Sequence, residues 1–100
     1  MKYIPIEFIQ GVYSFINREY LSQLYTIDFH MELLNNGISI EGYSISFRLS
    51  FKDISQVNEE LLNAYFQSVE TKNRDLEYPS KFTYYYKIIG NYLIIQTYLS

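Results

Sequence analysis

Cysteine is absent from this chain of 100 residues, which removes disulfide bonds, thiol nucleophiles and cysteine-based metal sites together. No apolar run approaches the roughly 18 residues that a membrane-spanning helix needs. The first residues lack the apolar stretch and small-residue cleavage site of a signal peptide. These absences predict a cytoplasmic protein without a membrane segment.

Basic residues are also few. Eight Lys and Arg stand against eleven Asp and Glu, so the formal net charge is −3. Binding to a phosphate backbone requires clustered cations, and here they are scattered along the chain. This balance argues against nucleic acid as the main partner.

Motifs for catalysis and cofactor binding are missing too. The sequence contains no G-x-S-x-G, Walker A, G-x-G-x-x-G or H-E-x-x-H pattern. The single histidine, His30, lies between Asp28 and Glu32 at alternating positions, a spacing that could orient an imidazole or supply part of a metal site. A solvated strand face explains the three side chains equally well, because a metal needs further ligands. We expect no enzyme activity, no cofactor and no metal; a small hydrolase using His30 is the weakest alternative.

Aromatic residues are abundant by contrast, with twelve Tyr and seven Phe. Tyrosine combines an apolar ring with a polar tip and is enriched at protein interfaces. The length and the apolar content predict one folded domain over residues 1–100. The usage of Asn, Ile, Lys and Tyr in so small a chain suggests a phage or mobile-element gene.

Residues 5–21 show a helical period. Apolar side chains recur at three- and four-residue spacing, at Ile9, Val12, Tyr13, Ile16 and Tyr20. Pro5 suits the first helical position, and Glu7 suits the positive end of the helix dipole. A short strand over residues 2–8 is the alternative.

The stretch from Leu24 to Phe51 shows a β-hairpin pattern, because apolar residues alternate with polar ones on both sides of Asn36-Gly37. Asn-Gly favours a type I′ turn. The apolar positions change from even to odd numbers at Glu41-Gly42, which predicts a β-bulge there. The resulting register pairs Met31 with Tyr43, Phe29 with Ile45, Ile27 with Phe47, and Tyr25 with Leu49.

A second helix is expected after this hairpin. Asp53 or Ser55 can cap its N-terminus, and the apolar stripe contains Ile54, Val57, Leu61, Ala64, Tyr65 and Val69. The helix should end near Lys72. Residues 73–80 then form a polar loop.

Lys81 to Leu99 predicts a second hairpin around Gly90-Asn91, where Gly in the first position suits a type II′ turn. On one face the register pairs Ile88 with Leu93, Tyr86 with Ile95, Tyr84 with Thr97, and Phe82 with Leu99. On the other face it pairs Ile89 with Tyr92, Lys87 with Ile94, Tyr85 with Gln96, and Thr83 with Tyr98. Unlike the first hairpin, this one is apolar or aromatic on both faces.

The fold class that follows is α+β, with element order α-β-β-α-β-β. Two hairpins form a four-stranded antiparallel sheet, and two helices cover the face that carries Phe29, Ile45, Tyr86 and Ile95. The opposite face of the second hairpin is then a candidate protein interface, made of Tyr85, Lys87, Ile89, Tyr92, Ile94 and Tyr98. In the alternative arrangement the first helix or the N-terminal segment covers this patch as ordinary core.

The function expected from these features is protein binding by a small non-enzymatic module of the inhibitor, immunity or adaptor type. A homodimer is one form that such binding can take. The alternative is a single-stranded nucleic-acid binder, because Lys81 to Lys87 interleaves aromatic and basic residues as stacking platforms do.

Overall fold

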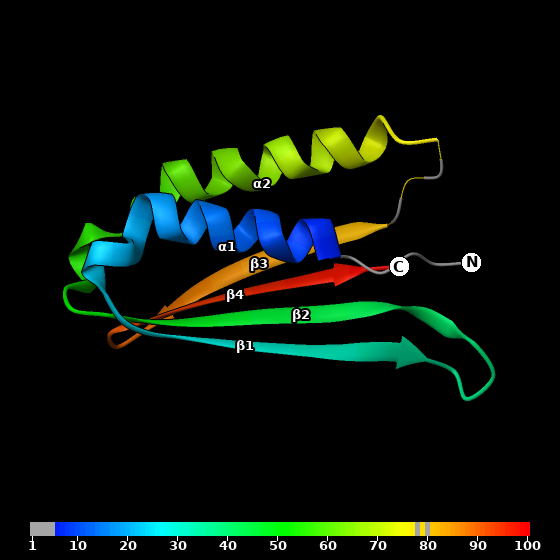
Figure 1. Cartoon of the computed structure of the whole chain (residues 1–100), viewed down its shortest axis with the longest axis horizontal. Helices are drawn as coiled ribbons and strands as arrows, with labels where there is room; N and C mark the ends of the chain where they lie inside the picture. The colour runs from blue at the N-terminus through cyan, green and yellow to red at the C-terminus, as the bar shows by residue number, and fades with distance from the viewer. Residues whose placement is uncertain (1–5, 78, 80) are drawn as a thin grey trace.

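The computed structural model (Figure 1) describes residues 6–77, 79 and 81–100. Its helices and strands are α1 (Ile6–Tyr20), β1 (Leu24–Asn35), β2 (Ile40–Phe51), α2 (Glu59–Arg74), β3 (Phe82–Ile89) and β4 (Tyr92–Leu99). Two short 3₁₀ turns, at Leu21–Gln23 and Ile54–Gln56, lie between α1 and β1 and between β2 and α2.

The four strands form one antiparallel sheet in the order β1-β2-β4-β3. Each hairpin contributes two neighbouring strands, and β2 pairs with β4 to join the hairpins. Both helices lie on the same face of the sheet, antiparallel to each other (Figure 1). The α+β class and the α-β-β-α-β-β order predicted from the sequence are therefore confirmed.

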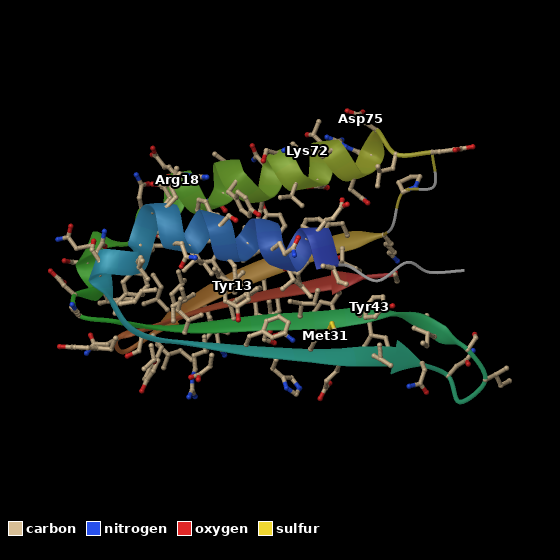
Figure 2. All side chains as sticks on the ribbon, viewed as in Figure 1. Tyr13, Arg18, Met31, Tyr43, Lys72 and Asp75 are labelled. Atoms are coloured by element: carbon tan, nitrogen blue, oxygen red, sulfur yellow. The ribbon has the colours of Figure 1, made fainter. Side chains whose placement is uncertain are left out.

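The core lies between the helices and the sheet. Its buried apolar side chains are Val12, Phe15, Ile16, Tyr20, Leu24, Tyr43, Ile45, Phe47, Leu49, Phe51, Leu62, Phe66, Leu93, Ile95 and Leu99. Aromatic pairs connect the two layers. Tyr13 points from α1 toward the sheet (Figure 2), and its ring centroid lies 5.1 Å from that of Phe47. The Phe66 ring of α2 stacks on the Tyr84 ring of β3 at 4.5 Å.

The turn of the first hairpin differs from the prediction. Asn35 pairs with Ile40, so four residues connect the strands instead of two. The Asn36 side-chain oxygen accepts hydrogen bonds from the backbone N–H groups of Ile38 and Ser39. Only Gly37 in this turn has a positive φ, +86°, whereas a type I′ turn needs positive φ at both central residues.

The longer turn moves the register of the first hairpin by two residues. The observed pairs are Leu33 with Tyr43, Met31 with Ile45, Phe29 with Phe47, and Ile27 with Leu49, so the four predicted pairs were wrong. A shift of two residues leaves every side chain on its predicted face, because strand side chains alternate with period two.

The predicted bulge is confirmed at its predicted place. Leu34 pairs with Gly42 and Asn35 with Ile40, which leaves Glu41 as the extra residue. A second irregularity occurs at Tyr25, between the Leu24 and Thr26 pairs. All eight predicted pairs of the second hairpin are present, and Gly90 has a φ of +58° while Asn91 does not have a positive φ, as a type II′ turn requires.

The helices start and end near their predicted limits, with one difference. Residues 6–8 are helical and so do not form a strand, while residues 2–5 lie outside the described residues. Residues 54 and 57 are not part of α2. Asp53 instead caps the short 3₁₀ turn by accepting from the Ser55 N–H, and Asn58 caps α2 by accepting from the Leu61 N–H at 3.1 Å. The helix ends at Arg74, near the predicted end at Lys72.

Candidate protein-binding surface

The face of the sheet away from the helices carries four columns of side chains, one from each strand. The strand register places them in four rows. We call these sixteen residues the outer face; in row order they are Glu32, Ser44, Tyr98, Thr83; His30, Ser46, Gln96, Tyr85; Asp28, Arg48, Ile94, Lys87; and Thr26, Ser50, Tyr92, Ile89. Figure 2 shows side chains projecting from this side of the sheet into open space.

All six residues of the predicted interface lie on the outer face. Tyr85, Ile89, Tyr92 and Tyr98 are exposed by 43%, 50%, 41% and 37% respectively, Lys87 is also exposed, and Ile94 is half-buried. Both helices pack on the opposite face, so neither α1 nor α2 covers these residues (Figure 1). The alternative in which the first helix turns this patch into core is therefore wrong, and the N-terminal segment named with it, residues 1–5, lies outside the described residues.

A hydrogen-bond network joins three columns of the outer face. The Tyr85 hydroxyl donates to the Gln96 side-chain oxygen, and the Gln96 side-chain nitrogen lies 3.0 Å from the Tyr98 hydroxyl and 3.4 Å from the Ser44 hydroxyl. Gln96 therefore holds two tyrosine rings in fixed orientations. Rings that are ordered before binding lose less conformational entropy when a partner docks.

Gln96 is the residue of this surface that sequence reasoning missed. Its pairing with Tyr85 was predicted, but its position as the centre of a network was not. The available signal was one side-chain amide, with donors and an acceptor, between tyrosines on neighbouring positions of the same face.

A second cluster lies on the other half of the outer face. The Arg48 guanidinium lies 3.2 Å from an Asp28 carboxylate oxygen, and its central carbon lies 5.2 Å from the centroid of the Tyr92 ring. The two residues lie directly opposite each other on β1 and β2. Arg48 therefore connects the acidic edge of the sheet to the tyrosine column, through an ion pair and a cation–π contact.

His30 has the surroundings of a surface residue. Its Nε2 lies 3.1 Å from a Glu32 carboxylate oxygen, and the two side chains are 68% and 66% exposed. Among residues 6–77, 79 and 81–100, no group of three or more His, Cys, Asp and Glu side chains could hold a metal ion. A water-excluded site, which would strengthen acid–base chemistry, is not formed around this imidazole.

Replacement of His30 by alanine is expected to leave both the fold and partner binding intact. The side chain is exposed and its one ion-pair partner is exposed as well, so the free energy of unfolding should change by less than about 0.5 kcal/mol. Thermal melting followed by circular dichroism measures the change. Loss of an activity at unchanged melting temperature would contradict this role and favour the hydrolase alternative.

Comparisons with known proteins add no relative to this picture. No family model, curated protein or solved structure matches the chain. In the part of the chain that the structure describes, no helix is long and apolar enough to cross a membrane. The chemistry of the outer face is therefore the basis for assigning a role.

Proposed function

We propose that this chain is a non-enzymatic protein-binding module, and that its outer face docks on a second copy of itself. The observation that supports this most is the arrangement of the two central columns. On β2 the outer positions carry Ser44, Ser46 and Ser50 around Arg48, whereas β4 carries the larger Tyr92, Ile94, Gln96 and Tyr98. A shallow column therefore runs beside a raised one.

Two such faces fit together in one orientation. A two-fold axis that lies between the sheets and parallel to the strands reverses the order of the columns in the second copy. The serines of β2 then lie under the tyrosine column of the partner's β4, and the reverse contact follows by symmetry. An axis perpendicular to the strands would instead place large side chains on large ones and serines on serines. Strands would stay aligned, as they do in β-sandwiches.

Charge supports the same orientation. Reversal of the column order brings Asp28 on β1 close to Lys87 of the partner subunit, whose strand is β3. The two-fold axis creates the same contact a second time, so the dimer contains two Asp28–Lys87 contacts. Opposite charges at the rim favour one docking orientation and suppress others. In the two central columns Arg48 is the one charged side chain, and Asp28 of the same copy is its ion-pair partner.

The size of the outer face fits a reversible dimer. Four strands about 4.8 Å apart and about eight residues long cover roughly 500 Å² in projection, or roughly 1,000 Å² for both copies. This value lies at the lower end of specific protein interfaces. Micromolar affinity, with exchange between monomer and dimer, is the expected regime.

The nucleic-acid alternative has less support. A strand-binding groove needs cations along its length beside its stacking rings. The outer face has Arg48 and Lys87, and Asp28 and Glu32 oppose them. Arg48 is also engaged by Asp28, so little positive charge remains for a phosphate backbone.

The proposal is tested by the double variant Tyr92→Ser with Ile94→Thr. We expect the wild-type chain to sediment as a concentration-dependent dimer at tens of micromolar and the variant to sediment as a monomer. Tyr92 and Ile94 are two large, neighbouring side chains of the raised column, and tyrosines at interfaces are often among the residues that contribute most to binding. Circular dichroism and thermal melting of the same samples report the fold.

A matched control changes the same residue types outside the outer face. Tyr25 and Ile38 are 70% and 93% exposed, and Tyr25→Ser with Ile38→Thr should leave the dimer unchanged. A wild-type chain that remains monomeric at several hundred micromolar would contradict self-association. A double variant that unfolds would show that the column supports the fold.

A further inference from the structure

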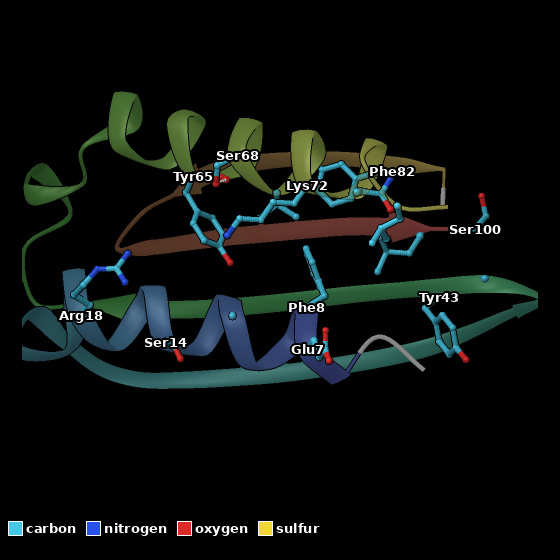
Figure 3. Close-up of a pocket in the computed structure, with 16 residues that line it drawn as sticks. Glu7, Phe8, Ser14, Arg18, Tyr43, Tyr65, Ser68, Lys72, Phe82 and Ser100 are labelled. Atoms are coloured by element: carbon cyan, nitrogen blue, oxygen red, sulfur yellow. Dashed lines mark hydrogen bonds between the residues drawn. The ribbon is translucent and has the colours of Figure 1, made fainter. Parts of the chain in front are cut away.

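A groove separates the two helices and opens to solvent above β2, β3 and β4 (Figure 3). It has a volume of about 520 Å³, which lies within the range of small-molecule sites. The helices approach each other closely where the Phe15 and Tyr65 rings stack with centroids 4.2 Å apart. This groove lies on the helix face and is distinct from the outer face.

The floor and sides of the groove are largely apolar. The residues that supply this surface are Phe8, Tyr43, Val69, Leu76, Phe82 and Leu99. The Phe8 and Phe82 rings meet edge to face, with centroids 5.8 Å apart, and join α1 to β3. An aliphatic chain bound in this groove would be removed from water and would make apolar contacts along its length.

One phenol in the groove has an unused hydroxyl. Tyr65 makes no side-chain hydrogen bond to any described residue, although it lines the groove. A Cβ at Gly11 would lie 3.3 Å from this hydroxyl, so the glycine allows the phenol to approach α1 closely. Burial raises the pKa of Tyr65, and Arg18 acts in the opposite direction through its charge. The hydroxyl is therefore a protonated donor near a guanidinium.

Two cations line the groove beside this phenol. Lys72 extends along the groove toward Tyr65 (Figure 3), and it forms no ion pair with a described acidic residue. Arg18 contacts Glu19 through Nε at 2.9 Å, which leaves its other nitrogens available. Glu7 lines the groove as well, but in Figure 3 it lies away from the Lys72 tip. The groove thus has a basic part, formed by Lys72 and Arg18, next to its apolar floor and sides.

From this arrangement we propose that the groove binds a medium-chain aliphatic carboxylate. The carboxylate accepts hydrogen bonds from the Lys72 ammonium and the Tyr65 hydroxyl, and the chain lies over Phe8 and Phe82. Charge-assisted hydrogen bonds fix the head group. The ligand needs no covalent step, so the site adds a binding activity that does not depend on dimer formation through the outer face.

Decanoate is the probe, titrated into ¹⁵N-labelled protein and followed by amide chemical shifts. We expect saturable shifts confined to α1, α2 and the neighbouring ends of β2, β3 and β4. Affinity should rise about fourfold for each methylene from octanoate to decanoate, because each buried CH₂ contributes a constant increment. Lys72→Met keeps the aliphatic stem and removes the charge, and it should weaken binding about tenfold.

Two controls separate this site from general adsorption. Lys87→Met removes a cation from the outer face and should leave the affinity for decanoate unchanged. Decyltrimethylammonium has the same chain with a cationic head and should bind at least about tenfold more weakly. Equal binding of the two amphiphiles, equal affinity of the Lys72→Met variant, or no saturable shift at millimolar decanoate would each overturn the proposal.

Discussion

Replacement of Gly42 by valine is expected to destabilise the fold by at least about 3 kcal/mol, because it overpacks a site with no space for a side chain. A Cβ at this position would lie 2.0 Å from the Leu99 carbonyl oxygen and 2.7 Å from the Ser100 Cα. Both contacts are to backbone, which cannot rotate away. Since Tyr43 pairs with Leu99 next to this point, separation of the strands would open the seam between the two hairpins. Urea unfolding followed by circular dichroism measures the loss.

Alanine at the same position identifies the cause. The clash involves the first side-chain carbon, so Gly42→Ala should cost nearly as much as Gly42→Val. If Gly42 serves only the bulge, alanine should instead cost about 1 kcal/mol. The neighbouring Glu41→Val is the matched control, because Glu41 is exposed at the extra position of the bulge. A Gly42→Ala protein as stable as wild type would contradict the close approach.

Replacement of Phe66 by alanine is expected to cost about 3–5 kcal/mol, the usual range when a large aromatic ring leaves a core. Phe66 is fully buried, stacks on Tyr84 at 4.5 Å and meets Tyr65 edge to face at 5.5 Å. It therefore joins α2 to β3. Domains of this size have roughly 5–15 kcal/mol of total stability, so the variant should be close to unfolding at ambient temperature.

Phe29 provides a control with the same residue type. Its ring contacts Tyr13 and Phe47, but it lies on the edge strand β1 and is 38% exposed. Phe29→Ala should cost about 1–2 kcal/mol, since water already reaches part of the ring. Equal losses for Phe29→Ala and Phe66→Ala would show that α2 does not anchor the sheet in the way described.

The two hairpins illustrate how far alternation alone predicts a register. Gly90-Asn91 allows one short turn, and its strands pair as the sequence indicates. In the first hairpin the Asn36 side chain competes for the backbone N–H groups of the turn and lengthens it by two residues. An alternating pattern cannot reveal this change, because a shift of two residues preserves both faces.

The start of α2 shows a similar competition between local signals. Ile54 and Val57 match the apolar stripe, but Asp53 and Asn58 each cap a separate segment. The exposed outer face was predictable, because alternation assigns side chains to faces. The network around Gln96 and the groove between the helices were not, since both depend on side-chain rotamers and on the spacing of elements that are distant in sequence.

The central claim is that the outer face packs on a second copy about an axis parallel to the strands. Because the chain has no cysteine, a cysteine introduced by substitution is the single thiol of the variant. In the proposed dimer, position 28 of one copy lies about 10 Å from position 87 of the other copy. The two copies of position 28 lie roughly 17 Å apart.

The decisive measurement mixes Asp28→Cys and Lys87→Cys proteins with a bismaleimide that spans about 10 Å, the expected distance between packed sheets. We predict a covalent heterodimer in high yield at concentrations where the wild type is dimeric, and little product from Asp28→Cys alone. Equal cross-linking in the mixture and in Asp28→Cys alone, or none in either at those concentrations, would contradict the proposed packing.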